Sequence, residues 1–340
     1  MEVKIFDNYP SNIKAWDDLC FASGNLVQST HFDKVQAFYK QKPIYFEVWN
    51  DSMLLAGVKM FFWQSEKNFL TRIISKRLSQ FGEVICIDSV KIDDIVDLIR
   101  EKVDCYLKKN RIVTYTVNGY YGGENLLIDL SLEAKKINYF KIAYINLLEK
   151  EDVLWSKVHS KHRNVIRKAI KNGVNILQDN NFNSFYFCLE KTYNNQELNP
   201  PNKDYLFNNY KHSSHLISIY QAYYEAQLLS SAWVSIYGTT AYYEFGGSVQ
   251  NSLGAGNYLQ WEIIKLLKKK NIHKYYLGQI AEDVSEKNIK FSLGITKFKV
   301  RFGVNEQSSF KKEYVLNITK NYFWIFLHNV FYALSKLRFK

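Results

Sequence analysis

The chain has 340 residues, of which 47% are hydrophobic, with only 4 prolines and 15 glycines. This length is typical of about two domains, and the composition excludes a disordered chain because it can build large apolar cores. Lys and Arg outnumber Asp and Glu by 45 to 33, so the net charge of +12 favours an anionic partner: a nucleic acid, a phosphorylated small molecule or an acidic membrane face.

The cysteines and the first residues indicate a cytoplasmic protein. No C-x-x-C pair occurs, and the scattered thiols are typical of a reducing compartment: Cys20, Cys86, Cys105 and Cys188. The stretch 1–10 carries charges and lacks the apolar core of a signal peptide. No apolar run of about 18 residues, enough to span a bilayer, is present.

Two hairpins are predicted in equivalent places of the two halves. Residues 45–62 alternate in polarity around a polar turn at 50–52, which predicts a β-hairpin. Residues 216–236 repeat this arrangement with a turn near Glu225, and Leu-Leu-Ser-Ser follows the turn where the first hairpin has Leu-Leu-Ala-Gly. The chain therefore looks duplicated.

The segments that follow the hairpins support this duplication. Residues 91–117 and 257–277 each give a helical pattern, then Lys-Lys-Asn, then a strand. Each half is thus a mixed α/β unit. A polar stretch near residue 150 predicts the boundary, giving domains at 1–150 and 151–318 and a tail at 319–340.

The second half carries a glycine-rich turn that the first half lacks. Gly254 and Gly256 directly precede a helix that we expect to begin near Asn257. A helix start exposes backbone N–H groups and the positive end of the helix dipole, which suits a phosphate. Gly254, Ala255, Gly256 and Asn257 are therefore candidate donor-binding residues, although an ordinary tight turn would give the same motif.

A helix with cations and no acids is predicted over residues 153–173, ending at Gly173. Its cations are Lys157, Lys161, Arg163, Arg167, Lys168 and Lys171. Such a helix either faces a negative partner or is an exposed Lys-rich surface. His159 and His162 are not expected to bind a metal, because the surrounding cations would repel it and no carboxylate or thiol accompanies them.

Near the end of the chain, Gly-Ile-Thr-Lys-Phe-Lys-Val-Arg-Phe-Gly occupies 294–303. Lys297, Lys299 and Arg301 alternate, and a period of two predicts a strand with all three cations on one face. This strand would be either an edge guarded by cations or a row of cations aimed at phosphate.

The last residues, 321–340, are aromatic and apolar, contain no acid, and end with Lys336, Arg338 and Lys340. They predict an amphipathic helix lying at a membrane interface, because Trp, Tyr and Lys favour that boundary. A helix docked on the protein core is the alternative.

Residues 155–303 resemble Fem-type aminoacyltransferases and related acyltransferases of the GNAT superfamily. The resemblance is carried by Ser-Lys-x-Arg-x-x-Ile-Arg-Lys-Ala from Ser160 to Ala169, then Gly173-Val174, and by the segments 241–248, 254–278 and 294–303. Residues 27–35 are similar to a helix start of the same family. The resemblance implies two tandem GNAT-like α/β domains followed by the amphipathic tail helix.

The resemblance also implies roles for individual residues. Lys299 takes the place of a Lys in the transfer site, where a cation would stabilise the oxyanion formed when an amine attacks an acyl carbonyl. Lys297 and Arg301, with Lys161, Arg163 and Arg167 of the basic helix, are the candidate substrate and phosphate contacts. Glu244, in the strand before the glycine turn, could accept the proton of the attacking amine, or be an ordinary hydrogen-bonded strand carboxylate.

Three segments of the chain depart from the family pattern. Tyr276 stands where many relatives have Asp, and Asn194 and Asn195 stand where many have an Arg. CoA-dependent relatives place an Arg or Gln before the glycine turn, where this chain has Asn251. We therefore expect weak or no CoA binding and a donor such as aminoacyl-tRNA held on the basic helix.

The sequence thus predicts an N-acyltransferase or aminoacyltransferase that acts on an amine of a peptidoglycan or cell-envelope precursor linked to a nucleotide or lipid. It is expected to bind no metal and no tight cofactor, to use aminoacyl-tRNA or acyl-CoA as donor, and to work in the cytoplasm at the inner face of the plasma membrane. One alternative is an acyl-CoA-dependent N-acyltransferase acting on a nucleotide- or lipid-linked sugar in surface-polysaccharide synthesis. Another is a non-catalytic RNA-binding protein, although no common RNA-binding motif accompanies the charge.

Overall fold

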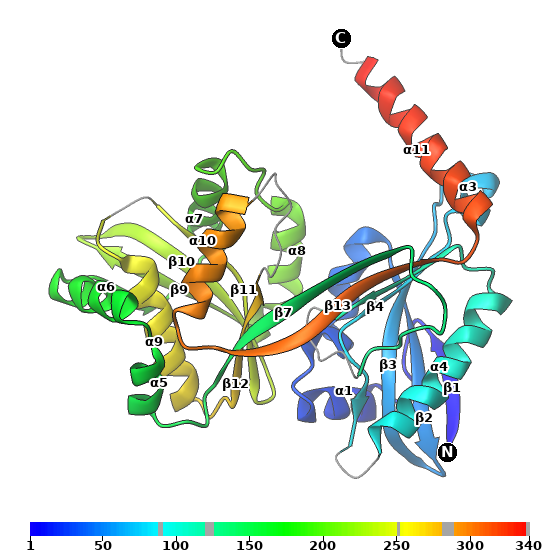
Figure 1. Ribbon diagram of the computed structural model, residues 1–340, viewed down its shortest axis with the longest axis horizontal. Coiled ribbons are helices and arrows are strands. Elements are labelled where there is room, and N and C mark those ends of the chain that lie inside the picture. The colour runs from blue at the N-terminus through cyan, green and yellow to red at the C-terminus, as the bar shows by residue number, and fades with distance from the viewer. Residues whose placement is uncertain (88–90, 120–125, 250–251, 281–288, 338–340) are drawn as a thin grey trace. The chain divides into compact units, whose positions relative to one another are not determined.

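The structure is a computed structural model that describes residues 1–340 except 88–90, 120–125, 250–251, 281–288 and 338–340. The chain forms two compact units (Figure 1). Unit 1 contains Met1–Ser23, Val27–Tyr139 and Ser309–Lys340, and unit 2 contains Gly24–Leu26 and Phe140–Ser308. This grouping differs from the predicted division at residues 150 and 318, because 140–150 lie in unit 2 and 309–318 lie in unit 1.

The sheet of unit 1 has the strand order β1-β2-β3-β4-β6-β13, and β5 pairs with β3. Its strands are β1 (Glu2–Asp7), β2 (Lys42–Asn50), β3 (Met53–Trp63), β4 (Arg77–Phe81), β5 (Ile85–Cys86), β6 (Thr114–Asn118) and residues 309–315 of β13 (Asn305–Val315). Its helices are α1 (Ile13–Ala22), α2 (His31–Gln36), α3 (Phe69–Ile74), α4 (Ile92–Lys109) and α11 (Ile318–Leu337).

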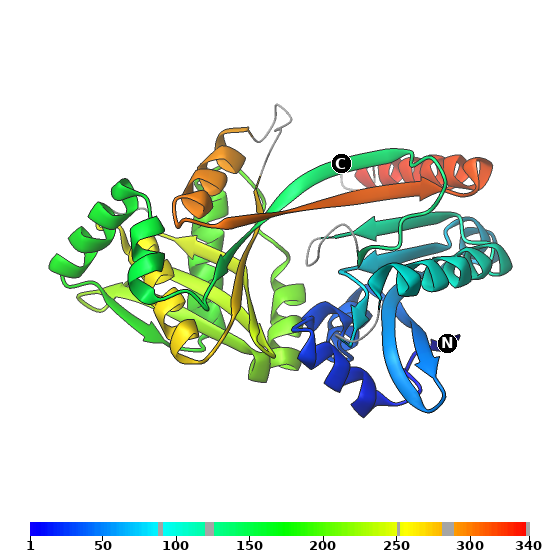
Figure 2. The same ribbon diagram turned by 60° about the horizontal axis from the view of Figure 1, so that its bottom comes forward.

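The strands of unit 2 have the order β7-β12-β11-β10-β9-β8, and Figure 2 draws them as green to yellow arrows. Its strands are residues 140–146 of β7 (Lys136–Asn146), with β8 (Asn175–Gln178), β9 (Ile217–Tyr224), β10 (Gln227–Tyr237), β11 (Thr240–Ser248) and β12 (Lys274–Ile280). Its helices are α5 (Glu151–Lys157), α6 (Ser160–Lys171), α7 (Phe182–Asn194), α8 (Lys203–Ser213), α9 (Ala255–Lys269) and α10 (Ile289–Val300).

The predicted duplication is confirmed by the strand pairings. In unit 1 the hairpin β2-β3 is followed by antiparallel β4, the crossover helix α4 and parallel β6. Unit 2 repeats this with the hairpin β9-β10, antiparallel β11, the helix α9 and parallel β12. Even the irregularities coincide, since the register of each hairpin shifts at an equivalent residue, Leu55 in β3 and Leu229 in β10.

The two units complete their sheets with strands from opposite parts of the chain. β6 pairs antiparallel with β13, which follows unit 2 in sequence, and β12 pairs antiparallel with β7, which follows the first half. Each unit therefore contains a strand that the other half of the sequence delivers.

Both predicted hairpin turns are present. The first has two residues between the strands, with Asp51 at a φ of 51°. In the second, Glu225 and Ala226 both have positive φ, 47° and 64°. Two such residues form the type of turn whose twist matches that of the flanking strands.

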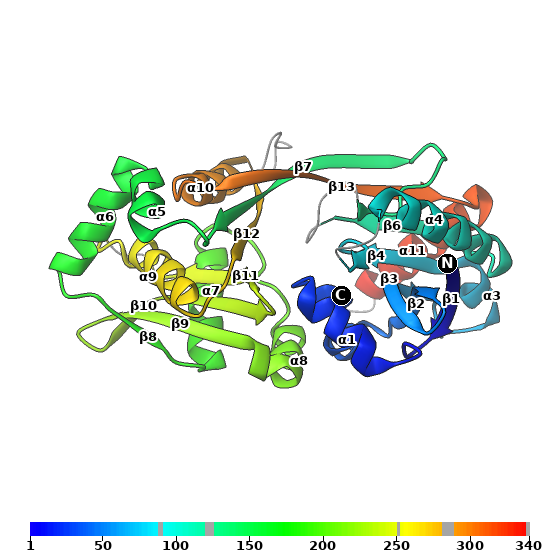
Figure 3. The same ribbon diagram turned by 90° about the horizontal axis from the view of Figure 1, so that it is seen from below.

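Helices cover both faces of the sheet in unit 2. The side chains of β10 alternate, so that Ala232 and Val234 pack in the same cluster as Ile263 of α9, whereas Trp233 packs with Phe185 of α7. Figure 3 shows α9 lying along these strands. This packing fixes the start of α9 against the end of β11.

Two local predictions are wrong. Residues 294–303 form no strand, because α10 extends to Val300 and a turn follows. The apolar residues Ile295, Phe298 and Phe302 recur at intervals of three and four, which is the spacing of a helix, and it outweighs the alternation of the cations. The single basic helix is instead two helices, α5 and α6, separated at Val158 and His159, both of which have extended backbones.

The predicted tail helix is confirmed as α11. Within the part of the chain that the structure describes, no helix has the length and hydropathy needed to cross a membrane.

Candidate active site

The glycine-rich turn builds the start of α9 as predicted. Gly254 is the N-cap residue, with a left-handed φ of 77°. A Cβ at this position would lie 2.3 Å from Cγ1 of Val165 on α6, so only glycine fits. The first amides of a helix have no partner within it, and those of Ala255 and Gly256 are such amides. The turn therefore presents backbone N–H groups to whatever lies before the helix.

A pocket of about 540 Å³ lies at this helix start. It is lined by Thr192, Asn195, Gln196, Ser248, Val249, Gly254, Ala255, Gly256, Asn257 and Phe298. Among these residues there is no charged side chain, so an anionic group here would rely on backbone amides and on the side-chain amides of Asn195, Gln196 and Asn257. All four predicted donor-binding residues are thus brought together.

A hydroxyl network holds the end of β11 beside the pocket. The Ser248 amide donates to Oγ1 of Thr192 at 2.7 Å, and the Ser248 hydroxyl lies 2.8 Å from that of Ser230. Ser230 also donates to the Gly247 carbonyl at 2.9 Å. A Cβ on Gly256 would lie 3.2 Å from the Ser248 hydroxyl, so the helix start is closely fitted to this network.

Strands β11 and β12 separate close to this pocket. Their parallel pairing covers Thr240 to Tyr242 on β11 and Lys274 to Tyr276 on β12. Beyond it, β11 continues to Ser248 and β12 continues to Ile280. The pairing between β11 and β12 therefore ends after Tyr242 and Tyr276, while both strands continue.

Both strands are irregular at the point of separation. Glu244 is the extra residue of a bulge in β11, because Trp233 pairs with Phe245 and Val234 with Tyr243. Bulges redirect side chains and occur often beside active sites. Glu244 is partly buried, and its predicted role in accepting a proton stays a prediction.

Lys299 lies on α10 and reaches β12 where that strand has left β11. Its Nζ donates to the Gln279 carbonyl at 2.9 Å and would lie 3.5 Å from a Cβ on Gly278, whose φ is 82°. Burial lowers the pKa of Lys299 from its usual 10.5 to about 8. Burying the charged form of a lysine costs free energy that other interactions in the fold must offset. Residues with such strongly shifted pKa values are often found at functional sites.

The other two cations of the predicted row lie elsewhere. Lys297 is exposed on α10, and a helix turns it away from Lys299. Arg301 follows the helix, and its carbonyl accepts a hydrogen bond from the amide of His159 at 2.8 Å. The three cations therefore share no face, and the expectation of a single cationic row is wrong.

Several cations of the basic segment make contacts within unit 2. Arg163 donates to the Ser156 carbonyl at 2.9 Å, and the Arg167 guanidinium lies 5.6 Å from the ring of Trp155. Lys161 is exposed. Lys168, to which the sequence assigned no separate role, donates to the Ser252 carbonyl at 3.1 Å and so ties α6 to the loop before α9.

His162 is buried against α10 and packs as a core residue. Its Nε2 lies 3.1 Å from the Phe298 carbonyl, and its ring packs edge-on to Phe302. Burial lowers the pKa of this imidazole. Among the described residues, no three His, Cys, Asp or Glu side chains are grouped to hold a metal ion. Asn251 lies outside the described residues.

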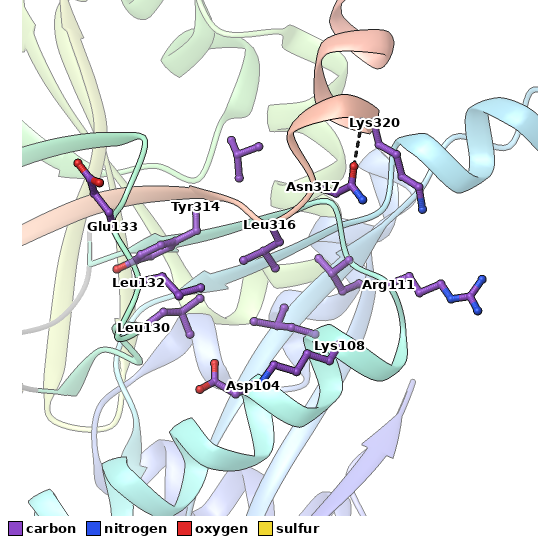
Figure 4. Close-up of a pocket in the computed structure, with 13 residues that line it drawn as sticks. Asp104, Lys108, Arg111, Leu130, Leu132, Glu133, Tyr314, Leu316, Asn317 and Lys320 are labelled. Carbon is purple, nitrogen blue, oxygen red and sulfur yellow. Dashed lines mark hydrogen bonds between the residues drawn. The ribbon is translucent and has the colours of Figure 1, made fainter.

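A second pocket, of about 590 Å³, lies in unit 1 between α4, the end of β13 and the start of α11 (Figure 4). Leu130, Leu132 and Leu316 form much of its apolar wall, and Tyr314 beside them donates a hydrogen bond to Asp129. No residue predicted to act in transfer lies in it. The pocket at α9 is therefore the better candidate.

No protein-family model and no curated protein sequence matches the chain. Solved structures do match. FemX superposes with a TM-score of 0.71 at 11% identity, covering 93% of this chain and 98% of FemX. The C-terminal domain of an Agrobacterium fabrum protein assigned as a lysylphosphatidylglycerol synthetase gives 0.55 at 10% identity, with 94% and 95% covered. A tandem GNAT protein from clavulanic acid biosynthesis gives 0.51 at 10% identity, with 92% and 98% covered.

These similarities extend over nearly the whole length of each solved chain. They confirm the predicted fold class, a mixed α/β chain of two tandem GNAT-like domains. They equally confirm the resemblance to Fem-type proteins at the level of the fold. The chain has the fold of FemX and of tandem GNAT proteins.

Proposed function

We propose that this chain is an N-acyltransferase that transfers an aminoacyl or acyl group to an amine of a peptidoglycan or other cell-envelope precursor. The observation that carries this proposal is Lys299, a partly buried cation with a lowered pKa that donates to the Gln279 carbonyl on β12, beyond the pairing of β12 with β11. The neighbours support the same class, since FemX superposes with a TM-score of 0.71, and another neighbour is named for attaching lysine to phosphatidylglycerol.

The chemistry requires few groups. The amine nitrogen attacks the carbonyl carbon of the donor ester or thioester, forming a C–N bond and a tetrahedral oxyanion. Collapse of this intermediate breaks the C–O or C–S bond, the nitrogen loses a proton, and the leaving group gains one. Lys299 would stabilise the oxyanion, an effect worth a few kcal/mol when the charge is fixed beforehand. Glu244 is the candidate acceptor for the proton of the amine.

The donor is proposed to be an aminoacyl-tRNA rather than acyl-CoA. The described lining of the α9 pocket offers amides but no Lys or Arg to hold a pyrophosphate. The exposed Lys161 and its neighbours on α6 supply positive charge for a larger polyanion. The tandem GNAT neighbour, whose structure is described as lacking acetyl-CoA, keeps the CoA-dependent alternative open.

The test is to incubate the protein with a nucleotide-linked muropeptide and either a mixed pool of aminoacyl-tRNAs or acetyl-CoA, and to identify the product by mass spectrometry. We expect a mass increase of one aminoacyl group with the tRNA pool only. Calorimetric titration with acetyl-CoA provides the second measurement. A dissociation constant in the low micromolar range, weakened by Gly256→Val, would contradict the aminoacyl donor and favour the CoA-dependent enzyme.

A further inference from the structure

The last helix exposes an unusual amount of apolar surface. Along α11, six large side chains are between 38% and 59% exposed: Ile318, Tyr322, Phe323, Ile325, Phe326 and Val330. At 3.6 residues per turn they lie within about half of the helix circumference. The opposite side is attached to unit 1, since Asn321 is buried and the Trp324 ring meets that of Trp63 edge-on at 5.8 Å.

A second segment beside α11 also exposes apolar side chains. Helix α3 contacts α11, and Figure 1 shows α11 extending away from beside it. Its first residues, Phe69 and Leu70, are 77% and 50% exposed. We call the eight exposed residues of the two helices the aromatic patch. Soluble monomers rarely expose apolar patches of this extent unless the patch binds something.

Cations outnumber acids beside the aromatic patch, and the neighbouring Glu66 is paired with Lys40. Neither residues 67–82 nor residues 314–340 contain an Asp or Glu. Lys67, Arg72 and Lys320 belong to the described part of these segments, and Lys135 places its Nζ 5.0 Å from the ring of Tyr322.

This charge decides between possible occupants. A second copy of the chain, docked through the same patch, would bring two sets of cations together with few acids to offset them, which is unfavourable. An anionic lipid surface would neutralise the cations while the aromatic side chains enter the boundary between headgroups and acyl chains.

We propose that the aromatic patch of α3 and α11 docks unit 1 onto the surface of a membrane containing anionic lipids. The docking is peripheral: α11 lies on the lipid surface, Phe69 and Phe326 insert from two segments distant in sequence, and the cations contact lipid phosphates. This proposal concerns lipid binding alone, so it does not rest on the acyl-transfer reaction.

The test is co-sedimentation of the full chain with vesicles of phosphatidylcholine alone or mixed with phosphatidylglycerol. We expect binding to the mixed vesicles that weakens as salt is raised, and a loss of at least about tenfold for Phe326→Glu and for Phe69→Glu. The matched control is Phe21→Glu on α1, because Phe21 is 57% exposed and Phe326 is 59% exposed. Circular dichroism and thermal unfolding of each variant confirm that it is folded.

Two outcomes would overturn the proposal. One is equal binding of the wild type, Phe326→Glu and Phe69→Glu to mixed vesicles, which would separate the patch from lipid binding. The other is that the wild type binds neither kind of vesicle and sediments as a dimer, whereas Phe326→Glu and Phe69→Glu sediment as monomers. That result would assign the patch to contact with a second copy of the chain.

Discussion

Replacing Lys299 with Met should make the protein less active and more stable at neutral pH. The lowering of its pKa from 10.5 to about 8 means that the folded state disfavours the charged form. At about 1.4 kcal/mol per pH unit, the buried charge costs about 3 kcal/mol of folding free energy below pH 8. Met removes this cost together with the hydrogen bond to Gln279. Activity should fall at least tenfold, because a charge aimed at the reacting group is worth more than about 1.4 kcal/mol.

The pH dependence gives the sharpest form of this prediction. Between pH 8 and 10.5 the unfolded chain binds more protons at this lysine than the folded chain, so the wild type gains stability as the pH rises. The Lys299→Met variant lacks this gain. Its advantage over the wild type should therefore shrink by about 2 kcal/mol between pH 7 and pH 9.5.

The measurement is denaturant unfolding of wild type and variant at both pH values, with transfer activity measured on the same preparations. Lys269→Met, at an exposed lysine near the end of α9, is the control for the loss of one charge. If the stability difference between Lys299→Met and wild type is the same at pH 7 and pH 9.5, burial does not destabilise the charged form of Lys299. Unchanged kcat/KM would remove Lys299 from the transfer site.

Three further predictions concern the rest of the chain. Lys59 is fully buried and pairs with Asp33 at 2.6 Å, so Lys59→Met should lower the free energy of unfolding by about 3–5 kcal/mol in urea titrations, because the carboxylate loses its partner. Gly254→Ala should lower the melting temperature even without ligand, since φ is 77° and a Cβ would strike α6; equal melting temperatures would contradict this. Under native conditions iodoacetamide should label the exposed Cys105 and not the buried Cys20, whose pKa burial raises, as peptide mapping can show.

The duplicated fold was predictable because its signals are local. Alternating residues around residues 50–52 and Glu225 defined both hairpins, and the helical periods after them defined α4 and α9. Gly254 marked the start of α9 because glycine is well tolerated at an N-cap and a helical pattern follows it directly. In each case, short-range backbone preference and the burial of one face favour the same structure.

The errors arose where two periods overlapped or where distant contacts decide. Residues 294–303 carry cations at a period of two and apolar residues at a helical period, and burial of Phe298 and Phe302 selected the helix. Lys168 meets Ser252 across 84 positions of sequence, and Ser230 meets Ser248 only through strand pairing. No local pattern could indicate that these polar groups hold the pocket in place.

The delivery of β13 to the sheet of unit 1 has a consequence for synthesis of the chain on the ribosome. β6 ends at Asn118, whereas its partner ends at Val315. At a synthesis rate of roughly 5–20 residues per second, about 10–40 s pass between the synthesis of Asn118 and that of Val315. During that interval the edge of β6 has no native neighbour, and such an edge can pair with another nascent chain. Low temperature, which slows translation, should therefore increase the need for chaperones, and a ribosome stalled before residue 309 should hold an incomplete first unit.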